Sequence, residues 1–308
     1  MLQKGTTLAG YRIDGVLGQG GMGTVYEANQ LSLDRVVALK LLAAHLSDDI
    51  QFRERFRREG QIQARLEHPH IVTVYEAGET EHGLFIAMRL VRGRTLKDLV
   101  NAHELDVDRT LKILAPVAEA LDEAHGIGLI HRDIKPQNVL VGRRDHSFLA
   151  DFGLTKGTTE TSLTRTGHFV GTWDYIPPEQ INGLRATSAS DIYSLTAVLY
   201  ECLTGEVPYP RPAEAAVLYA HVSDPPPRPT AHKPELPAQL DEIVARGMAK
   251  EPAERHASAG ELIEEVRGAF AVAPPVVEPE PLDVTRARPV PPAPAELTAP
   301  APTARAAR

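Results

Sequence analysis

Apolar and polar residues alternate in short runs along the first third of the chain. The runs are rich in Val, Tyr and Leu, and glycines or polar residues separate them, which is typical of β-strands. The pattern predicts five strands, at 11–17, 24–29, 35–42, 71–77 and 84–91.

A different period appears once among these strands. Phe52, Phe56, Ile62 and Leu66 follow one another at helical spacing, and Pro69 stands just beyond them, where a helix stop is expected. The spacing predicts an amphipathic helix over 50–66.

After Gly93 helical spacing dominates. It predicts six helices, at 95–101, 107–127, 187–204, 212–222, 236–248 and 257–270. Strands followed by helices indicate an α+β fold with two lobes. The small lobe, rich in strands and with one helix, is expected over about 8–91, and the larger, mostly helical lobe over about 92–270.

The segment 271–308 differs from the rest of the chain. Ten of its 38 residues are proline and none is aromatic. Such a segment cannot bury enough surface to offset its chain entropy, so we expect a disordered, partly extended tail or linker. The folded domain is therefore assigned to 1–270, and the tail could dock partners that recognise proline-rich segments.

Charge and cysteine content exclude some classes of protein. A net charge of -8 argues against a general nucleic-acid binder, which needs clustered Lys and Arg. The single cysteine, Cys202, excludes an internal disulfide framework and a thiolate metal site. No run reaches the ~20 apolar residues that span a bilayer. A cytoplasmic location is expected, either for this chain or as the cytosolic part of a longer membrane-anchored protein.

The most informative motif is a short polar run with a second motif after it: His131-Arg132-Asp133-Ile134-Lys135-Pro136-Gln137-Asn138, then Asp151-Phe152-Gly153. Phosphoryl transfer needs a group that orients a hydroxyl, a cation for the moving phosphate and oxygen ligands for a metal ion, and the two motifs supply all of these. The pattern H-R-D-x-x-x-x-N followed by D-F-G resembles the catalytic signature of the protein kinases.

The resemblance implies a role for each polar residue. Asp133 would act as the base that accepts the proton of the substrate hydroxyl, and Lys135 would neutralise the γ-phosphate. A lysine at this place is similar to the Ser/Thr kinases rather than the tyrosine kinases. Asn138 and Asp151 would hold Mg²⁺, with Mn²⁺ as an alternative, because both metal ions prefer oxygen ligands.

A glycine-rich turn lies between the first two expected strands. Gly18, Gly20 and Gly23 form a G-x-G-x-x-G frame, which alone is a weak signal. The residues after it continue as a strand, whereas a dinucleotide-binding fingerprint leads into a helix. A hairpin of this kind resembles the kinase loop that lays backbone N–H groups over phosphates.

Lys40 lies in the next strand, in the run Val37-Ala38-Leu39-Lys40. It resembles the V-A-I-K lysine that contacts the α- and β-phosphates. Its expected partner is Glu59 on the following helix, with Glu54 as the alternative. Because this pair forms only when the helix swings inward, it would act as an on/off contact.

The remaining nucleotide contacts also follow from the resemblance. Met88 would be the gatekeeper, and Arg89, Leu90 and Val91 would form the hinge that pairs with adenine. Arg89 stands where related bacterial kinases have an acidic residue, and Gln63 stands where the family has an apolar one. The full set implied for ATP is Leu17, Gly18, Gly20, Gly23, Val25, Ala38, Lys40, Met88, Arg89, Leu90, Val91 and Leu140.

Many hydroxyl residues separate Asp151-Phe152-Gly153 from Pro177-Pro178-Glu179, and most of them suit an ordinary polar loop. Thr164 and Thr166 are more specific, because they resemble a T-x-T pair that bacterial receptor-type kinases autophosphorylate. A phosphate there would form charge-assisted hydrogen bonds with Arg132. Asp191 resembles the buried aspartate on a helix of the kinases that holds the catalytic loop. Glu179 resembles the kinase glutamate that pairs with an arginine, which is Arg255 in this chain.

Taken together, the motifs cover roughly residues 8–270. They are closest to the bacterial eukaryotic-like Ser/Thr kinases and similar to the actinobacterial receptor-type kinases. The resemblance implies ATP- and Mg²⁺-dependent phosphorylation of Ser and Thr in protein substrates, with autophosphorylation in trans within a homodimer. The alternative is a pseudokinase, an ATP-binding scaffold without turnover.

Overall fold

An antiparallel sheet forms the amino-terminal part of the fold. The computed structural model describes residues 1–21, 23–43, 46, 50–152 and 173–271. Six strands pair in the order β1-β2-β3-β4-β6-β5, and every neighbouring pair is antiparallel. The strands are β1 (Thr7–Leu8), β2 (Tyr11–Gly20), β3 (Gly23–Gln30), β4 (Arg35–Leu42), β5 (Val74–Thr80) and β6 (Gly83–Arg89).

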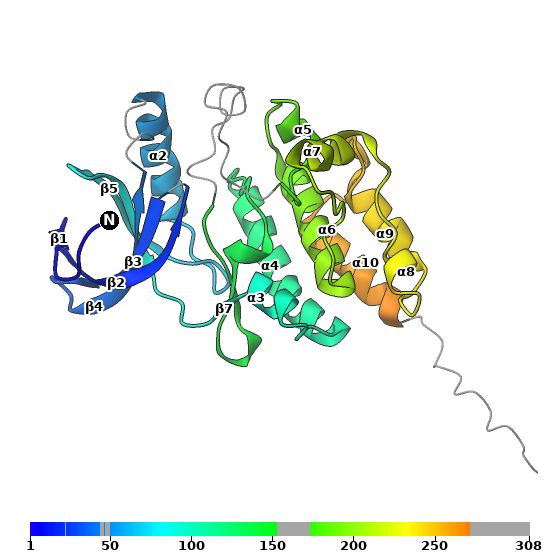
Figure 1. Cartoon of the computed structure of the whole chain (residues 1–308), viewed down its shortest axis with the longest axis horizontal. Coiled ribbons are helices and arrows are strands. Elements are labelled where there is room, and N and C mark those ends of the chain that lie inside the picture. Colours follow the sequence, from blue (N-terminus) through cyan, green and yellow to red (C-terminus); the bar gives the residue numbers. More distant parts are fainter. Residues whose placement is uncertain (22, 44–45, 47–49, 153–172, 272–308) are drawn as a thin grey trace, which may run out of the picture. The chain divides into compact units, whose positions relative to one another are not determined.

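Helix α2 (Ile50–Gln63) lies beside this sheet (Figure 1). Phe52, Phe56, Glu59, Gly60 and Gln63 are its buried residues, and their spacing places them along one side of the helix. The two phenylalanine rings stack with their centroids 6.5 Å apart. Packing of the phenylalanines therefore turns Glu59, an ionisable residue, toward the interior.

Helices dominate from residue 96 onward (Figure 1). A small three-stranded sheet of β7 (Arg94–Thr95), β8 (Val139–Val141) and β9 (Ser147–Leu149) lies among them in sequence. The helices are α3 (Leu96–Asn101), α4 (Val107–Gly126), α5 (Pro178–Ile181), α6 (Ser188–Thr204), α7 (Glu214–Ser223), α8 (Pro229–His232), α9 (Gln239–Gly247) and α10 (Ala259–Ala271), with 3₁₀ turns η1 (Pro136–Asn138), η2 (Arg143–Asp145) and η3 (Pro252–Glu254).

Helix α6 runs through the core of this helical part. A capping box between Thr187 and Ser190 begins it, and Gly205 ends it with a positive φ of 85° that favours glycine. Every residue from Ser190 to Thr204 is buried. Because a helix buried on all sides has no solvated face, its polar side chains must find partners inside the protein.

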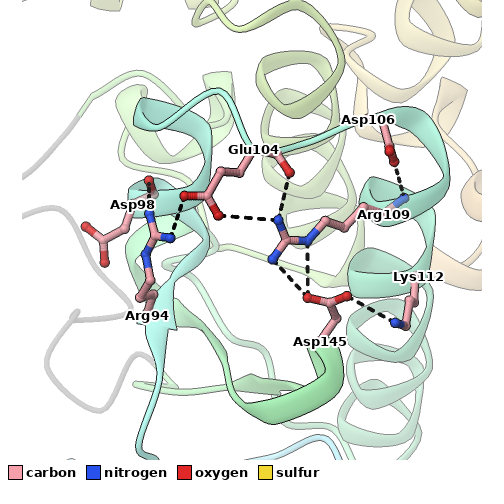
Figure 2. Close-up of polar contacts among 7 residues, drawn as sticks. All are labelled: Arg94, Asp98, Glu104, Asp106, Arg109, Lys112 and Asp145. Carbon is pink, nitrogen blue, oxygen red and sulfur yellow. Dashed lines mark hydrogen bonds and ion pairs between the residues drawn. The ribbon is translucent and has the colours of Figure 1, made fainter.

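A polar cluster fastens the β8–β9 hairpin to α4 (Figure 2). Arg109 on α4 donates from Nε and Nη2 to Asp145 Oδ1, at 3.1 and 3.0 Å, and Lys112 Nζ lies 3.0 Å from Asp145 Oδ2. Arg109 also donates to the carbonyl oxygen of Glu104, whose carboxylate binds Arg94. The hairpin that follows the catalytic motif is thus attached to the helical core.

The expected α+β fold is confirmed. The short strands β1, β7, β8 and β9 were not predicted, and among the five predicted strands one is displaced at both ends by three residues. A strand was expected at 71–77, but β5 begins at Val74 and ends at Thr80. The apolar pair Ile71-Val72 instead pairs with the end of β9: Val72 N–H donates to Leu149 O at 2.9 Å. The apolar run is therefore extended, but only its last part belongs to the large sheet.

Candidate active site

The buried carboxylate of Asp191 anchors the catalytic loop. Asp191 on α6 is 1% exposed, and it accepts hydrogen bonds from the backbone N–H groups of His131 and Arg132, both at 2.8 Å. His125 Nε2 lies 2.8 Å from the same carboxylate. Arg132 has a φ of 65°, an uncommon conformation for a residue with a side chain. Asp191 holds the loop in this strained turn.

His131 joins the catalytic loop to the segment around Asp151. Its Nε2 lies 3.0 Å from Ala150 O and its Nδ1 3.2 Å from the N–H of Asp133, so the Nε2–H tautomer satisfies both contacts. Burial lowers the pKa of His131 and keeps the ring neutral. The ring packs on Phe152 with centroids 4.6 Å apart. The contact thus joins the first residue of the catalytic loop motif to the middle residue of Asp151-Phe152-Gly153.

Asp133, Lys135 and Asn138 form one contact set. Lys135 Nζ lies 2.8 Å from Asp133 Oδ2. Asn138 Nδ2 donates to the backbone oxygen of Asp133 at 2.8 Å and to its Oδ2 at 3.1 Å. A carboxylate held beside an ammonium group can orient a hydroxyl while the cation meets the negative charge of a phosphate.

Asn138 and Asp151 lie at the same end of the β8–β9 hairpin. Val139 pairs with Leu149, and the N–H of Ala150 donates to Asn138 O at 2.9 Å. Since Asn138 Nδ2 is directed at Asp133, its side-chain oxygen is directed away from that carboxylate. Asp151 Oδ1 binds Lys40, which leaves Oδ2 for another cation. Two hard oxygens at one end of a hairpin fit a magnesium ion that keeps several waters.

Lys40 and Glu59 have partners other than the expected ones. Lys40 Nζ binds Asp151 Oδ1 at 2.8 Å, and Arg132 Nη1 binds Glu59 Oε1 at 2.7 Å. The members of the predicted Lys40–Glu59 pair are therefore engaged with the two catalytic motifs instead. All four side chains are less than 36% exposed, so these ion pairs are only partly screened by solvent.

The residues expected around adenine gather in one apolar cluster. Ala38 lies opposite Met88 in the sheet, and both side chains are buried. Four partly buried residues of the expected set pack against the same cluster: Val25, Leu90, Val91 and Leu140. Apolar side chains from both parts of the chain thus form a surface suited to an aromatic ring.

The glycine-rich loop has one position that only glycine fits. Gly23 has a φ of 141°, and a Cβ added there would lie 2.1 Å from Leu41 O. Gly18 and Gly20 are exposed on β2, as is Leu17. Gly23 therefore allows close approach of β3 and β4, whereas Gly18 and Gly20 leave their own positions near the end of the hairpin without side chains.

The two departures from the family pattern have different surroundings. Arg89 is exposed, and its guanidinium lies 4.8 Å from the centroid of the Phe148 ring. Gln63 is 4% exposed, and its Oε1 has no hydrogen-bond partner among the described residues. Arg89 is thus accommodated on the surface, whereas Gln63 places an unsatisfied carbonyl oxygen in the interior.

The regulatory prediction falls largely outside the described residues. Thr164 and Thr166 lie in 153–172, which the structure does not describe. Their expected partner Arg132 is described, and Glu59 occupies its guanidinium. The other expected pair is formed: Arg255 Nη1 and Nη2 lie 2.7 and 2.9 Å from the two oxygens of Glu179.

The sequence did not single out a small pocket beside the catalytic loop. Arg132, Asp133, Lys135, Tyr175, Pro177 and Gln180 are among its lining residues. Gln180 Nε2 donates to Arg132 O at 3.4 Å, which ties α5 to the loop. Tyr175 and Gln180 flank the Pro177-Pro178-Glu179 motif in the sequence. Their positions next to this motif are the feature of the sequence that could have identified them as site residues.

Comparisons with known proteins agree with this geometry. A family model described as the protein kinase domain matches residues 11–265. Serine/threonine-protein kinase PknH of Mycobacterium bovis is 43% identical over 259 residues, which cover 84% of this chain and 44% of that protein. PknE of the same species is 41% identical over 272 residues, 88% of this chain and 48% of that protein. The chain spans less than half the length of these relatives.

A solved structure shows the same fold. The crystal structure of the Mycobacterium tuberculosis PknI kinase domain is 32% identical and aligns with a TM-score of 0.73, over 88% of this chain and 100% of that chain. The antiparallel sheet with one helix and the helical remainder are therefore those of a kinase domain. In the part of the chain that the structure describes, no helix is long and apolar enough to cross a membrane.

Proposed function

Because the chain belongs to the protein kinase family, we propose that it transfers the γ-phosphoryl group of ATP to Ser and Thr hydroxyls of protein substrates. The observation that carries the proposal is the contact set of Asp133, Lys135 and Asn138, with Lys135 Nζ 2.8 Å from Asp133 Oδ2. Phosphoryl transfer depends on positioning and on charge stabilisation, and this set supplies both.

Each residue of the set has one task. Asp133 orients the substrate hydroxyl and accepts its proton as the oxygen attacks the γ-phosphorus. Lys135 stabilises the charge on the phosphate oxygens, and Lys40 the charge on the α- and β-phosphates. Asn138 and Asp151 would hold Mg²⁺, or Mn²⁺ in its place, which when bound neutralises phosphate charge.

The base of ATP binds in the apolar cluster around Ala38 and Met88. Backbone groups of the hinge, residues 89–91, pair with adenine, while the side chains of the cluster cover its ring. Arg89 does not interfere, because its guanidinium is exposed and lies over Phe148. The glycine-rich loop binds the phosphates of ATP through its backbone, because Gly18 and Gly20 have no side chains that would cover their N–H groups.

Autophosphorylation of Thr164 and Thr166 belongs to the same proposal, and Arg132 is the residue that links it to catalysis. In this structure Arg132 binds Glu59 and thereby holds it away from Lys40. A phosphothreonine carries nearly two negative charges and would compete with Glu59 for the guanidinium. Glu59 released in this way could pair with Lys40, and Asp151 would then be free of Lys40 to bind metal. Mapping of phosphorylated residues after incubation with ATP tests the first step.

The Arg132–Glu59 contact is also the observation that favours the alternative, an ATP-binding scaffold without turnover. A chain fixed in this arrangement would bind nucleotide but would not complete the Lys40–Glu59 pair. The two candidates predict the same ATP binding and different turnover.

Substitution of Asp133 by Asn separates them. We expect Asp133→Asn to keep ATP affinity and to lower turnover on a mixed Ser/Thr protein substrate by about 10²–10⁴-fold, because it removes the base. Asp108→Asn, an exposed aspartate in the first turn of α4, is the matched control and should leave turnover unchanged. Transfer of labelled γ-phosphate from ATP with Mg²⁺ measures turnover. ATP binding without turnover in the unsubstituted protein would support the scaffold.

A further inference from the structure

A buried carboxylate outside the catalytic motifs contacts Tyr175, one of the residues that line the small pocket beside the catalytic loop. Glu201 on α6 is 2% exposed. Lys97 Nζ on α3 lies 2.5 Å from its Oε1, and the hydroxyl of Tyr175 donates to its Oε2 at 2.6 Å. A buried carboxylate is costly unless it is paired, so both partners matter to this site.

Tyr175 connects this carboxylate to the pocket. The backbone oxygen of Tyr175 accepts a hydrogen bond from Ser194 Oγ at 2.7 Å, while its hydroxyl binds Glu201. Tyr175 and Ser194 line the pocket together with Asp133 and Lys135. A peptide whose hydroxyl reaches Asp133 would therefore place its neighbouring residues beside Tyr175, close to the Lys97–Glu201 pair.

Lys97 is the accessible member of that pair. Its side chain is 26% exposed, against 2% for Glu201. Removing the ammonium group would therefore open a route from solvent to the carboxylate. Asp174 is a neighbour of the same pair. Burial raises the pKa of its carboxyl group, the charge of Lys97 opposes that rise and the charge of Glu201 adds to it. Removing the ammonium group would therefore leave the carboxyl groups of Asp174 and Glu201 without the cation that they share.

We propose that Lys97 determines specificity by occupying, from within the chain, the position where a basic side chain of a peptide substrate would bind Glu201. The proposal rests on the proposed kinase function. A tethered ammonium group has an effective concentration on the order of millimolar, so a substrate lysine or arginine at lower concentration does not displace it. The unsubstituted protein should accordingly show no preference for a basic residue near the phosphorylated hydroxyl.

The test replaces Lys97 with methionine, which keeps an unbranched apolar chain and removes the charge. Peptides with one Ser or Thr carry Arg, Leu or Glu at each neighbouring position, and kcat and KM are measured for each. We expect Lys97→Met to gain about a tenfold preference for Arg over Leu at one position, expressed in KM, because a charge-assisted hydrogen bond to Glu201 becomes available.

Two further variants identify the cause. Lys97→Arg restores a cation beside Glu201 and should keep the unsubstituted profile. Lys97→Met combined with Glu201→Gln should lose the gain, because no carboxylate remains. If Lys97→Met melts too low for assay, Lys97→Gln carries the same comparison, since its neutral amide keeps a polar group near Glu201 but binds a carboxylate more weakly than a substrate guanidinium does.

Peptide binding separates failure of this proposal from failure of the kinase function. Fluorescence anisotropy of labelled Arg and Leu peptides reports selectivity even where no phosphate is transferred. Absence of turnover in the unsubstituted protein counts against the kinase function alone. Equal selectivity of Lys97→Met and the unsubstituted protein, in turnover or in binding, overturns the role of Lys97.

Discussion

At the scale of single residues, Arg132 has the most consequential contacts. Its N–H binds Asp191, its Nη1 binds Glu59 and its carbonyl oxygen accepts from Gln180. The backbone contacts fix the loop, so the side chain can change partner without moving Asp133. Regulation by partner exchange is therefore compatible with a catalytic loop that stays in place.

The sequence predicted some residue contacts and not others for a physical reason. Asp133, Lys135 and Asn138 lie within six positions, so their spacing alone brings them near one another. Glu59 and Arg132 are 73 positions apart, and their contact depends on where α2 lies. A motif identifies residues with a shared chemistry but does not determine which of two partners an arginine binds in a given state.

Gln63 provides a prediction about stability. We expect Gln63→Met to raise the free energy of unfolding by about 1–2 kcal/mol, because it replaces a buried carbonyl oxygen without a described partner by an apolar group of similar shape. Urea denaturation monitored by circular dichroism measures the change.

The matched control for Gln63 is on the same helix. Gln61 on α2 is exposed, so Gln61→Met should change the free energy of unfolding by less than about 0.5 kcal/mol. A loss of stability in Gln63→Met would mean that the amide has a partner, and it would contradict the assignment of Gln63 as unsatisfied.

At the scale of elements, short helices depend on contacts rather than on their own sequence. Helix α5 has four residues and α8 also has four, and each begins with proline. A helix of one turn is not stable alone and cannot show an apolar period. The sequence therefore predicted the long helices and missed these two, although it identified Glu179 of α5 through its motif.

The Glu179–Arg255 pair is what holds α5 in place. Burial alone would raise the pKa of Glu179, but the bonds and charge of Arg255, with the Ser190 hydroxyl 2.6 Å from Oε1, outweigh it and lower the pKa. Because the pKa is lower in the folded state, the pair stabilises the protein above the unfolded pKa of about 4.3, and this contribution is lost as pH falls through the folded pKa.

We expect Arg255→Ala to lower the free energy of unfolding by about 3–5 kcal/mol at pH 7, because it leaves a buried carboxylate unpaired. The loss should shrink as the pH falls through the folded pKa of Glu179, which Arg255 holds below the unfolded value of about 4.3, because a protonated carboxyl no longer needs the charge of Arg255. Urea denaturation at a series of pH values measures both effects.

Arg246 is the control for this pair. It binds Glu261 and Glu265 through side chains that are 35–40% exposed, so Arg246→Ala should cost about 1 kcal/mol or less. Similar losses in the Arg246 and Arg255 variants would show that burial does not distinguish the two pairs.

At the scale of the whole molecule, strands precede helices along the chain as the sequence predicted, except for the small sheet of β7, β8 and β9, which it missed. The reason is that period 2 and period 3.6 are local properties of the sequence. Contacts between the two parts are long-range, and the sequence did not predict the Lys40–Asp151 and Glu59–Arg132 pairs that join them. The tail and the segment with Thr164 and Thr166 lie outside the described residues, so their assignments stay predictions.

Phosphosite mapping after incubation with ATP and Mg²⁺ tests the central claim, that this chain transfers phosphate, most directly. Mass spectrometry of the unsubstituted protein should find phosphate on Thr164 and Thr166, and Asp133→Asn treated in parallel should carry none, because the base is required. Phosphate on other residues only would remove the Thr164–Thr166 switch and keep the kinase. An unsubstituted protein that gains no phosphate, or an Asp133→Asn variant that gains as much, would contradict the account.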